Sequence, residues 1–546
     1  MKSSLRTLAT VAIVLAAYGT AHAQKSWNVA SGNWNTAGNW APSGVPVAGD
    51  AVVITNGGTA TLDTGPSNLG SLTIGSSSLL RRDNSSTARS ISGTVATGLI
   101  TNSGTIRYGQ GSGLFTITSG SSGWNNSGLI TADVVGQEVR VSVNANNIFF
   151  INTGTVQADG GVLAFANSGG SGSFNMTNTG GALRVNSSGT LVFRAGSRIT
   201  GGSLSIDAGS VFQYNRTNER VDLTNVTVTN AGRMFTEQNA GAQSMAINFL
   251  GTTTVTNSGT LEYLTSGSLN APVASGTVAS TATFTNQSNA LLRIANTSSG
   301  TANAFFGIGT SNFTNQGRIE VFSTAGLTTG SSQLRSGTNV SNAGSILVDG
   351  PVSSIEMGAR TLTQTAGSLS LVNGGRMTAG SVLINSGTLL GTGTINAPVT
   401  IGGILAPGDA GFGTLTVSNN LTWTAGQNWR FELGVSGTSL GTAGTSDLLS
   451  LTGTFTGSGS GFTFDFANSG TDGWYKLVDY ASTTFTTGTS TQFAATNLPA
   501  GKTANFVVDS STTALYVQIV PEPSTLALAG LGIGLAGLAV SRRRRG

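Results

Sequence analysis

The side chains of this chain that could do chemistry are carboxylates, and Asp133 and Asp159 are the best-spaced pair among them. Glycoside hydrolysis uses two carboxyl groups about 5–10 Å apart, and lyase chemistry uses a basic residue beside a metal held by clustered acids. The two aspartates are 26 residues apart. If one turn of a repeat takes that length, their carboxylates would stack on one face. Equally, they could lie on separate solvated turns.

Most other catalytic classes are excluded by composition. The 546 residues contain no Cys and a single His, His22, which lies in a segment predicted to be removed. A Cys–His nucleophile, a Ser–His–Asp triad and a zinc site of thiolate or imidazole ligands are therefore excluded for the mature chain. The Gly-Thr-Gly at 391–393 lacks the Lys-Ser/Thr of a phosphate loop, and Asp465, Asp472 and Asp479 lack calcium-loop spacing. No cofactor and no metal are expected.

The elements that would position these side chains come from a repeat. A phrase of Asn, a small residue, usually Gly, and then a small residue or Arg before an aliphatic recurs at intervals of mostly 24–29 residues. Two intervals are longer, at 52 and 43 residues, and a degenerate copy at 202–206 divides the first of them. The phrase begins at Asn102, Asn126, Asn152, Asn178, Asn230, Asn257, Asn286, Asn315, Asn342 and Asn385.

Between these phrases the apolar residues alternate, as at Leu183 and Val185 and then at Leu191 and Phe193, which is the period of a strand. Such a repeat predicts an all-β fold, a right-handed parallel β-helix (solenoid) over residues 51–420 with about 14 coils. Glycine is expected to supply positive backbone angles at the corners. Asparagine is expected to occupy left-handed turns while its amide forms a ladder between coils.

Both ends of a solenoid need covering, because bare strands invite edge-to-edge pairing. Residues 24–50 hold three of the seven tryptophans, Trp27, Trp34 and Trp40, and predict a Trp-rich N-terminal cap. The alternative is a surface cluster that binds sugars by stacking. Residues 421–519 are richer in Phe, Trp and Tyr and predict a β-rich C-terminal capping region.

The N-terminus has the pattern of a secretory signal peptide. Lys2 and Arg6 precede an apolar stretch that closes with Ala21-His22-Ala23. Residues 1–23 are therefore predicted to be removed by cleavage between Ala23 and Gln24. The apolar run is short for an uncleaved membrane anchor.

The C-terminus, residues 520–546, has the pattern of a second targeting signal. Pro521, Glu522 and Pro523 precede an apolar stretch from Leu526 to Val540, which is predicted to be a transmembrane helix. A basic tail of Arg542, Arg543, Arg544 and Arg545 follows. Arginines at this place stay on the cytoplasmic side, so the body would lie outside the inner membrane. A plain C-terminal membrane anchor is the alternative.

The three parts in this order resemble the PEP-CTERM sorting signal of exopolysaccharide-producing Gram-negative bacteria. The resemblance implies recognition by a membrane-embedded, exosortase-type sorting peptidase that cuts near the Pro-Glu-Pro motif. The membrane helix would then anchor the chain before processing, and the protein would afterwards be at the cell surface or secreted.

A second resemblance covers residues 367–433, where 390–395 and 413–417 are similar to the autotransporter-passenger-associated repeat. It implies a β-helical passenger shape for this portion. No outer-membrane β-barrel follows, so an autotransporter route is not expected.

The net charge of +4 belongs to the two ends, because residues 24–519 hold 20 Lys and Arg against 21 Asp and Glu. A nucleic-acid partner is therefore not expected. The sequence predicts an exported, non-enzymatic structural protein of the cell surface or extracellular matrix, with extracellular polysaccharide as a candidate partner. The alternatives are a secreted polysaccharide lyase or glycosidase of β-helix type and a carbohydrate-binding adhesin.

Overall fold

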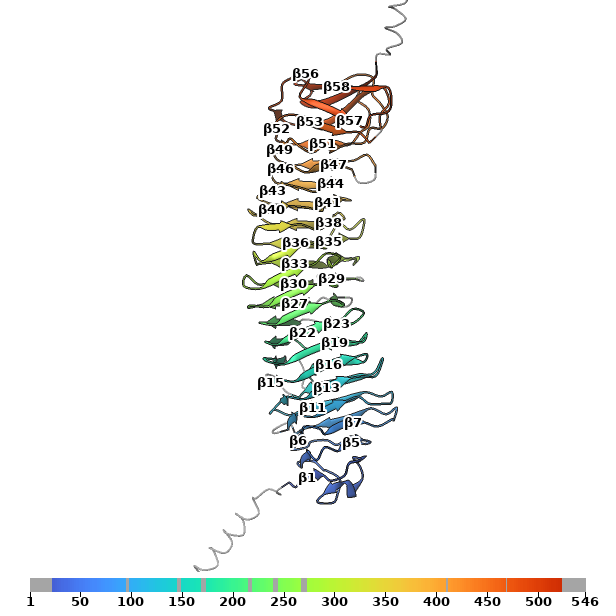
Figure 1. Ribbon diagram of the computed structural model, residues 1–546, viewed down its shortest axis with the longest axis vertical. Coiled ribbons are helices and arrows are strands. Elements are labelled where there is room, and N and C mark those ends of the chain that lie inside the picture. Colours follow the sequence, from blue (N-terminus) through green and yellow to red (C-terminus); the bar gives the residue numbers. More distant parts are fainter. Residues whose placement is uncertain are drawn as a thin grey trace, which may run out of the picture. The chain divides into compact units, whose positions relative to one another are not determined.

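The computed structural model describes residues 22–522 apart from 95–97, 145–148, 168–172, 215–218, 239–243, 267–272, 409–410 and 468. The chain divides into two compact units. Unit 1 comprises Met1–Leu264 and Pro272–Phe284, and unit 2 comprises Thr265–Ala271 and Thr285–Gly546. In each unit the chain winds through three strand positions per turn, here named the first, second and third sheets (Figure 1).

Unit 1 begins with β1 (Gln24–Trp27), β2 (Ser31–Asn33), the 3₁₀ turn η1 (Ala37–Asn39) and β3 (Trp40–Ala41). Its first sheet contains β1, β3, β4 (Ala51–Ile54), β6 (Ser71–Ile74), β9 (Leu99–Asn102), β12 (Trp124–Asn126), β15 (Phe149–Asn152), β18 (Phe174–Thr177), β21 (Ser197–Thr200), β24 (Glu219–Thr224), β27 (Ser244–Leu250) and β30 (Val273–Val278). Its second sheet contains β2, β5 (Thr59–Leu62), β7 (Leu79–Arg82), β10 (Thr105–Arg107), β13 (Leu129–Ala132), β16 (Thr155–Asp159), β19 (Ala182–Asn186), β22 (Ser203–Ile206), β25 (Thr227–Asn230) and β28 (Thr254–Asn257). Its third sheet contains β8 (Arg89–Ser92), β11 (Phe115–Ser119), β14 (Glu138–Val143), β17 (Val162–Asn167), β20 (Thr190–Phe193), β23 (Val211–Tyr214), β26 (Arg233–Gln238) and β29 (Thr260–Thr265).

Strand β31 (Thr283–Asn286) includes the last residues of unit 1 and the first of the long segment of unit 2. The first sheet of unit 2 contains β33 (Asn303–Ile308), β36 (Ser331–Ser336), β39 (Ser353–Glu356), β42 (Arg376–Thr378), β45 (Thr394–Asn396), β48 (Thr414–Val417), β51 (Leu448–Leu451) and β54 (Gly473–Asp479). Its second sheet contains β34 (Phe313–Asn315), β37 (Val340–Asn342), β40 (Thr361–Gln364), β43 (Ser381–Ile384), β46 (Val399–Ile401), β49 (Leu421–Thr424), β52 (Thr454–Ser458) and β55 (Ser482–Thr483). Its third sheet contains β32 (Leu291–Asn296), β35 (Arg318–Ser323), β38 (Ser345–Asp349), β41 (Ser368–Val372), β44 (Thr388–Gly391) and β47 (Ile404–Pro407).

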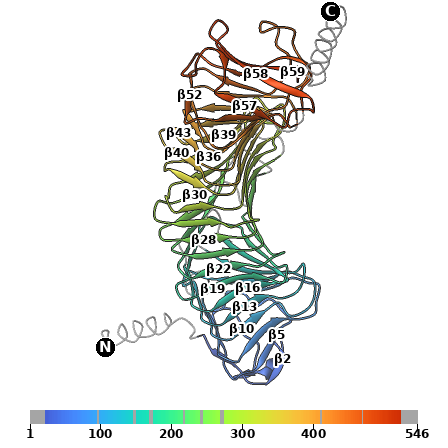
Figure 2. The same ribbon diagram turned by 45° about the horizontal axis from the view of Figure 1, so that its top comes forward.

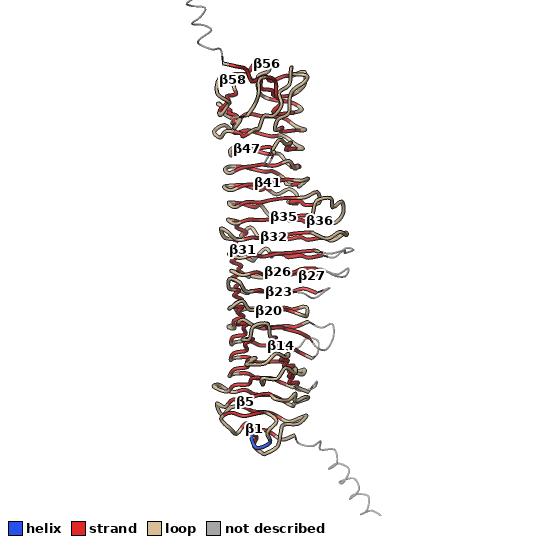
Figure 3. Tube along the Cα trace, turned by 90° about the vertical axis from the view of Figure 1, so that its right-hand side faces the viewer, coloured by secondary structure: helices blue, strands red, loops and turns tan. Residues whose placement is uncertain are grey.

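Apart from the antiparallel pairs of β1 with β3 and of β54 with β59 (Ala514–Pro521), the strands of the three sheets pair in parallel with their equivalents in neighbouring coils. Ile106 of β10, for example, is opposite Leu80 of β7 and Ile130 of β13. The predicted all-β parallel solenoid is therefore confirmed, with about 16 turns within the described residues. Figure 2 shows β10, β13, β16 and β19 of unit 1 as successive layers. Figure 3 shows β20, β23 and β26 of the third sheet stacked in the same way.

Inward-facing side chains form continuous apolar rows, because the parallel register places equivalent residues above one another. In unit 1 the ring centroids of Phe165 and Phe193 are 5.0 Å apart, and those of Phe193 and Phe212 are 5.5 Å apart. One row of unit 2 consists of Leu292, Ile319, Ile346, Leu369, Leu389 and Leu405. Burial of these rows supplies the main stabilisation of each stack.

The Asn of the repeated phrase is buried, and its amide joins neighbouring coils. In unit 1, Asn102 Nδ2 donates to Asn126 Oδ1 over 2.7 Å, and the chain of bonds continues through Asn152 to Asn178. In unit 2 the same bond, at 2.6–2.7 Å, links Asn286, Asn315, Asn342 and Gln364. The predicted ladder is confirmed. The predicted left-handed conformation is wrong for these residues, because the described asparagines with positive φ are Asn68, Asn225, Asn289, Asn373 and Asn497.

The repeated phrase occupies two different corners. Asn102 to Asn178 lie where the chain turns from the first sheet to the second, whereas Asn230 and Asn257 end second-sheet strands. Asn230 is paired with Ile206 of the degenerate copy. The 52-residue interval therefore contains two short coils, and over it the phrase moves from the corner after the first sheet to the corner after the second sheet. At the other long interval, Gln364 pairs with Ile384, so Asn385 lies one position beyond the ladder.

In most copies of the phrase the Gly is required by a close approach rather than by its backbone angle, whereas Gly180 and Gly387 have the predicted positive φ. A Cβ on Gly128 would lie 2.1 Å from the carbonyl oxygen of Gly104, and one on Gly344 would lie 2.0 Å from that of Gly317. Neither Gly128 nor Gly344 has a positive φ. The expectation of positive angles was therefore wrong for these corners, although many other glycines of the described residues do have them.

The three N-terminal tryptophans form one buried cluster. Trp34 is fully buried and contacts Trp40 edge to face, with ring centroids 4.8 Å apart. Trp27 contacts Trp40 in the same way at 4.9 Å, and Trp40 Nε1 donates to the carbonyl of Trp34. Since the indole faces are covered, these rings do not present a surface on which a sugar could stack.

The chain of unit 2 ends in an aromatic region with antiparallel strands. Trp423 and Trp429 stack with ring centroids 3.7 Å apart. A small parallel sheet consists of β50 (Trp429–Arg430), β53 (Phe462–Asp465) and β57 (Phe493–Thr496). Beside it, β59 (Ala514–Pro521) pairs antiparallel with β54 and with β58 (Lys502–Asp509), and β58 pairs with β56 (Gly488–Ser490).

Within the described part of the chain, no helix is long and apolar enough to cross a membrane. The predicted transmembrane helix, Leu526–Val540, lies outside the described residues.

Candidate functional site

The C-terminal motif begins directly on a strand of unit 2. Pro521 ends β59 opposite Lys502, and the backbone N–H of Glu522 donates to the carbonyl of Gly501 over 2.8 Å. Strand β59 lies between β54 and β58. Glu522, the second residue of the Pro-Glu-Pro motif, is therefore held by a backbone hydrogen bond of the folded body, and Pro521 is the last residue of a paired strand. Pro523, Leu526 to Val540 and the tail from Arg542 to Arg545 lie outside the described residues.

The predicted N-terminal cleavage point also adjoins a strand. Gln24 is the first residue of β1 and is paired with Ala51, and the N–H of Ala51 donates to the carbonyl of Ala23. Ala21 lies outside the described residues. The mature chain predicted from the sequence would thus begin at the first residue of the first strand.

The candidate carboxylates Asp133 and Asp159 occupy successive coils. Ala132 and Ala158, the residues before them, are paired in β13 and β16. Asp133 forms an ion pair with Arg107, and its Oδ1 accepts from the N–H of Gly109. Asp159 accepts from Asn186 Nδ2 over 3.1 Å. The register thus brings the two aspartates to neighbouring coils, and each carboxylate has its own structural partner.

Several other carboxylates of the solenoid are also paired with arginine, namely Asp83, Glu138, Asp222, Glu262 and Glu320. Glu138 binds Arg140 and Arg194, at 2.9 and 2.6 Å. Glu320 binds Arg318 and Arg293, at 2.6 and 3.3 Å. Within the described residues, no group of three or more His, Asp or Glu side chains is placed to hold a metal ion.

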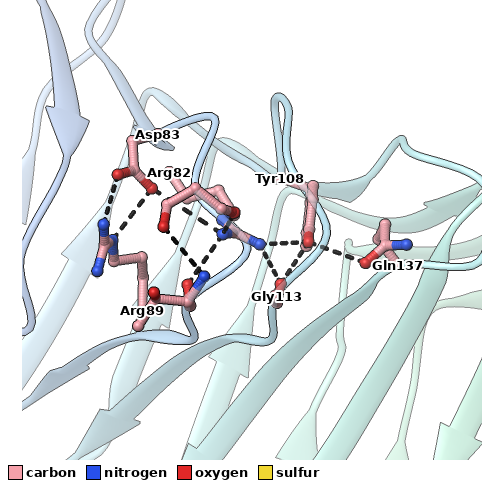
Figure 4. Close-up of polar contacts among 8 residues, drawn as sticks. Arg82, Asp83, Arg89, Tyr108, Gly113 and Gln137 are labelled. Atoms are coloured by element: carbon pink, nitrogen blue, oxygen red, sulfur yellow. Dashed lines mark hydrogen bonds and ion pairs between the residues drawn. The ribbon is translucent and has the colours of Figure 1, made fainter.

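The densest polar cluster surrounds Arg82, a residue that sequence reasoning did not select (Figure 4). The buried guanidinium donates to Tyr108 Oη and to the carbonyls of Ser85, Thr87 and Gly113. Tyr108 Oη also contacts Gln137 Oε1 at 3.1 Å. Burial raises the pKa of Tyr108, and the charge of Arg82 opposes that shift.

Beside this cluster, Asp83 and Arg89 form a two-bond ion pair of 3.0 and 2.5 Å. Burial raises the pKa of the Asp83 carboxyl, but hydrogen bonds from Arg89 and the Ser85 backbone, with the charges of Arg89 and Arg82, together outweigh burial and hold the pKa below its usual value. Every hydrogen-bond acceptor of Arg82 is a carbonyl or a phenol, and the Asp83 carboxylate lies 3.9 Å from its guanidinium. The cluster therefore fixes the loops that follow β7 and β10, and it presents no activated nucleophile.

A second residue that the sequence did not single out is Asp447 in unit 2, which is buried. Its Oδ1 accepts from the N–H of Gly413 at 3.0 Å and its Oδ2 accepts from the N–H of Glu432 at 2.7 Å. Burial raises the pKa of Asp447 to about 7, against the opposing effect of these two hydrogen bonds. No spacing pattern marks this aspartate, because the segments that enclose it lie far apart in the sequence.

The sequence also gave no sign that two large apolar side chains are exposed on the first sheet of unit 1. Phe149 is 59% exposed and Ile151 is 43% exposed, both on β15. Alternation predicts only which residues of a strand share a face. Which face is buried depends on the coils above and below.

No curated protein sequence matches this chain. One family does match, and its match lies at the C-terminus, over residues 520–545. The family is described as the PEP-CTERM protein-sorting motif. It begins at the residue before Pro521, on the strand that unit 2 holds in its antiparallel sheet. The resemblance seen in the Pro-Glu-Pro, apolar and arginine segments is thereby confirmed, and the chain carries a PEP-CTERM sorting motif on a parallel β-solenoid.

Proposed function

We propose that this protein is a non-enzymatic structural component of the cell surface or extracellular polysaccharide matrix of a Gram-negative bacterium. The motif at 520–545 implies an exported protein that exosortase-type machinery recognises and processes at the C-terminus. In the proposal, the tail anchors the chain in the inner membrane until it is cut. The body is a right-handed solenoid whose ends are covered by residues 24–50 and 421–519.

The observation that carries the proposal is the direct connection of the sorting motif to a body built for stability. Glu522 is bonded to Gly501, and the Asn ladders and aliphatic rows of the body hold one coil to the next. Long outward rows of hydroxyl side chains, such as Thr227, Thr254 and Ser203 of the second sheet, offer many weak contacts to a glycan.

A polysaccharide lyase or glycosidase of β-helix type is the competing proposal. It receives little support from the described carboxylates, because Asp133 is engaged by Arg107 and Asp159 by Asn186. Turnover of acidic polysaccharides by the wild type, abolished in Asp133→Ala and retained in Asp207→Ala, would replace the structural proposal with this one. Asp207 is exposed and serves as the matched control.

Mass spectrometry of the protein from cells with and without the sorting peptidase tests the processing step. We expect loss of the terminal arginines only when the peptidase is present. Replacing Arg542 to Arg545 by Ser should block processing, whereas replacement by Lys retains the charge and should allow it. An intact C-terminus in both strains would contradict the proposal.

Fractionation then tests retention. The processed protein is expected in the cell-surface or matrix fraction and to be released when the matrix is digested. Complete recovery in the culture medium as a freely diffusing protein would contradict a structural role.

A further inference from the structure

The outward face of the first sheet of unit 1 carries an unusual set of side chains around β15. Phe149 and Ile151 are two of the six exposed large apolar side chains among the described residues. Exposed aromatic rings are otherwise rare in this molecule, whose Trp and Phe side chains are mostly buried. A ring left open to solvent on a regular sheet is an available stacking surface.

The register places polar groups in line with this ring. Phe149 is opposite Asn175 of β18, and Asn175 is opposite Arg198 of β21. In the adjacent column, Ile151 is opposite Thr177, and Thr177 is opposite Thr200. One aromatic ring, one amide and one guanidinium thus follow each other along three successive coils.

These side chains surround a shallow hollow. Its volume is about 220 Å³, and it is lined by Phe149, Asn175, Met176, Thr177, Arg198 and Thr200. With neighbouring strands about 4.8 Å apart, the ring and the guanidinium are roughly 10 Å apart along the stack. A single extended chain lying along the coils can therefore reach both.

The positive charge of Arg198 is not engaged in an ion pair with any described residue. The residue is exposed. Asp222, its neighbour in the next coil, is buried and engaged by Arg220 at 3.0 Å and by Asn248 at 2.9 Å. The guanidinium therefore faces solvent beside the hollow and can receive a carboxylate from a ligand.

We propose that this face binds an acidic polysaccharide of the uronic-acid class. The apolar face of one pyranose ring stacks on Phe149, the sugar hydroxyls bond to Asn175 and Thr177, and a uronate carboxylate pairs with Arg198. This inference deepens the proposed matrix function and rests on it for the presence of polysaccharide around the exported protein.

Affinity electrophoresis of the full processed protein through gels containing polygalacturonate tests the site, with neutral dextran gels as the comparison. We expect retardation by polygalacturonate only. Arg198→Gln should weaken binding roughly tenfold or more, since it removes a charge-assisted hydrogen bond. Phe149→Ala should weaken it about fivefold through the lost stacking.

Two controls make the same chemical change elsewhere on unit 1. Arg184→Gln removes an exposed arginine of the second sheet, and Val135→Ala truncates an apolar side chain that is 81% exposed. Both should bind as the wild type does. Raised salt should weaken wild-type binding and leave the residual binding of Arg198→Gln nearly unchanged.

Equal binding by the site variants and the controls would overturn the inference, as would equal retardation by dextran. Concentration-dependent self-association that is lost in Phe149→Ala, without polygalacturonate binding, would assign the face to a second protein instead. The proposed function has a separate test, because it is contradicted if the wild-type protein is absent from the matrix fraction. If the wild type and Arg198→Gln are both retained in the matrix fraction, only the proposed binding site is contradicted.

Discussion

At the scale of single residues, the buried amides of the Asn ladder show most clearly how a repeated residue type determines the structure. Asn126 accepts from Asn102 and donates to Asn152, so its side chain is saturated on both sides. Truncation would remove one acceptor of Asn102 Nδ2 and the donor to Asn152 Oδ1 in a site closed to water, while the bonds from Asn102 to Leu129 and from Asn152 to Asn178 remain. A buried polar group without a partner costs more than the bond itself contributes.

We therefore expect Asn126→Ala to lower the free energy of unfolding by about 2–4 kcal/mol, because one substitution breaks two buried hydrogen bonds. Asn125→Ala is the matched control, since Asn125 is the preceding residue and its side chain is exposed. Chemical denaturation followed by circular dichroism compares the two. Equal midpoints would show that the ladder contributes nothing to stability.

Asp447 predicts a pH dependence of stability. Because burial raises its pKa to about 7 in the folded state, the folded protein holds a proton that the unfolded chain has released above about pH 4. Stability should therefore fall as pH rises between about 4 and 7, with a slope of up to about 1.4 kcal/mol per pH unit.

The Asp447→Asn variant should lose this slope, whatever its absolute stability, because the amide does not titrate. Asp207→Asn changes an exposed aspartate and should keep the slope. Unfolding midpoints measured from pH 4.5 to pH 8 decide between them. Asp83 acts in a different window, since its lowered pKa means that its contribution is lost only as the pH falls through the acidic range.

At the scale of elements, the corners decide which residues the repeat can tolerate. The Gly corners bring a backbone carbonyl of one coil against the Cα of the next, and no side chain fits between them. The strands themselves require only alternation, which explains why Val, Leu, Ile and Phe interchange along one inward row.

Gly344→Ala is expected to destabilise unit 2 by about 1–3 kcal/mol or more, because the new Cβ would lie 2.0 Å from the carbonyl oxygen of Gly317. Gly337→Ala places a Cβ where no atom lies within 4 Å and should change stability little. Thermal unfolding of both variants measures the difference. A similar loss at both positions would refute the packing explanation.

At the scale of the whole molecule, processing should invert the charge. The precursor has a pI of about 9.6. Removal of residues 1–23 and of the tail after Glu522 leaves 20 Lys and Arg against 22 Asp and Glu. We expect the mature protein to focus below pH 7. Loss of the signal peptide alone would leave 24 basic and 22 acidic residues and a basic band.

The sequence was sufficient to predict the architecture, because every coil of a solenoid carries a similar sequence pattern. The Asn phrase and the alternation agree with the parallel stack, whereas the estimate of about 14 coils was lower than the observed number of about 16 turns. It was insufficient for the corners, because the same phrase occurs at two different corners. Asn178 and Asn230 look equivalent in sequence, but Asn178 follows a first-sheet strand and Asn230 ends a second-sheet strand. Coils of unequal length conceal that shift.

Some of the candidate sites could be predicted from the sequence and others could not. The sorting motif was predictable because its three parts are contiguous, and a peptidase must read them in order. The surroundings of Arg82, Asp447 and Phe149 were not, because each has a partner from a segment that is distant in sequence, respectively Gly113, Gly413 and Asn175. Burial of the Trp cluster likewise depends on rings that meet only after the chain has folded back on itself.

The ladder bonds have one more consequence, which concerns how such a chain can change in length. Within the ladder, Asn126 and Asn152 each accept a bond from the preceding coil and donate one to the next, so the two edges of such a coil are complementary to each other. A duplicated coil would meet, on both sides, the same partners that its parent met. Gene duplication within such a stack can therefore add or remove repeats without a new core, and later divergence can be confined to outward positions.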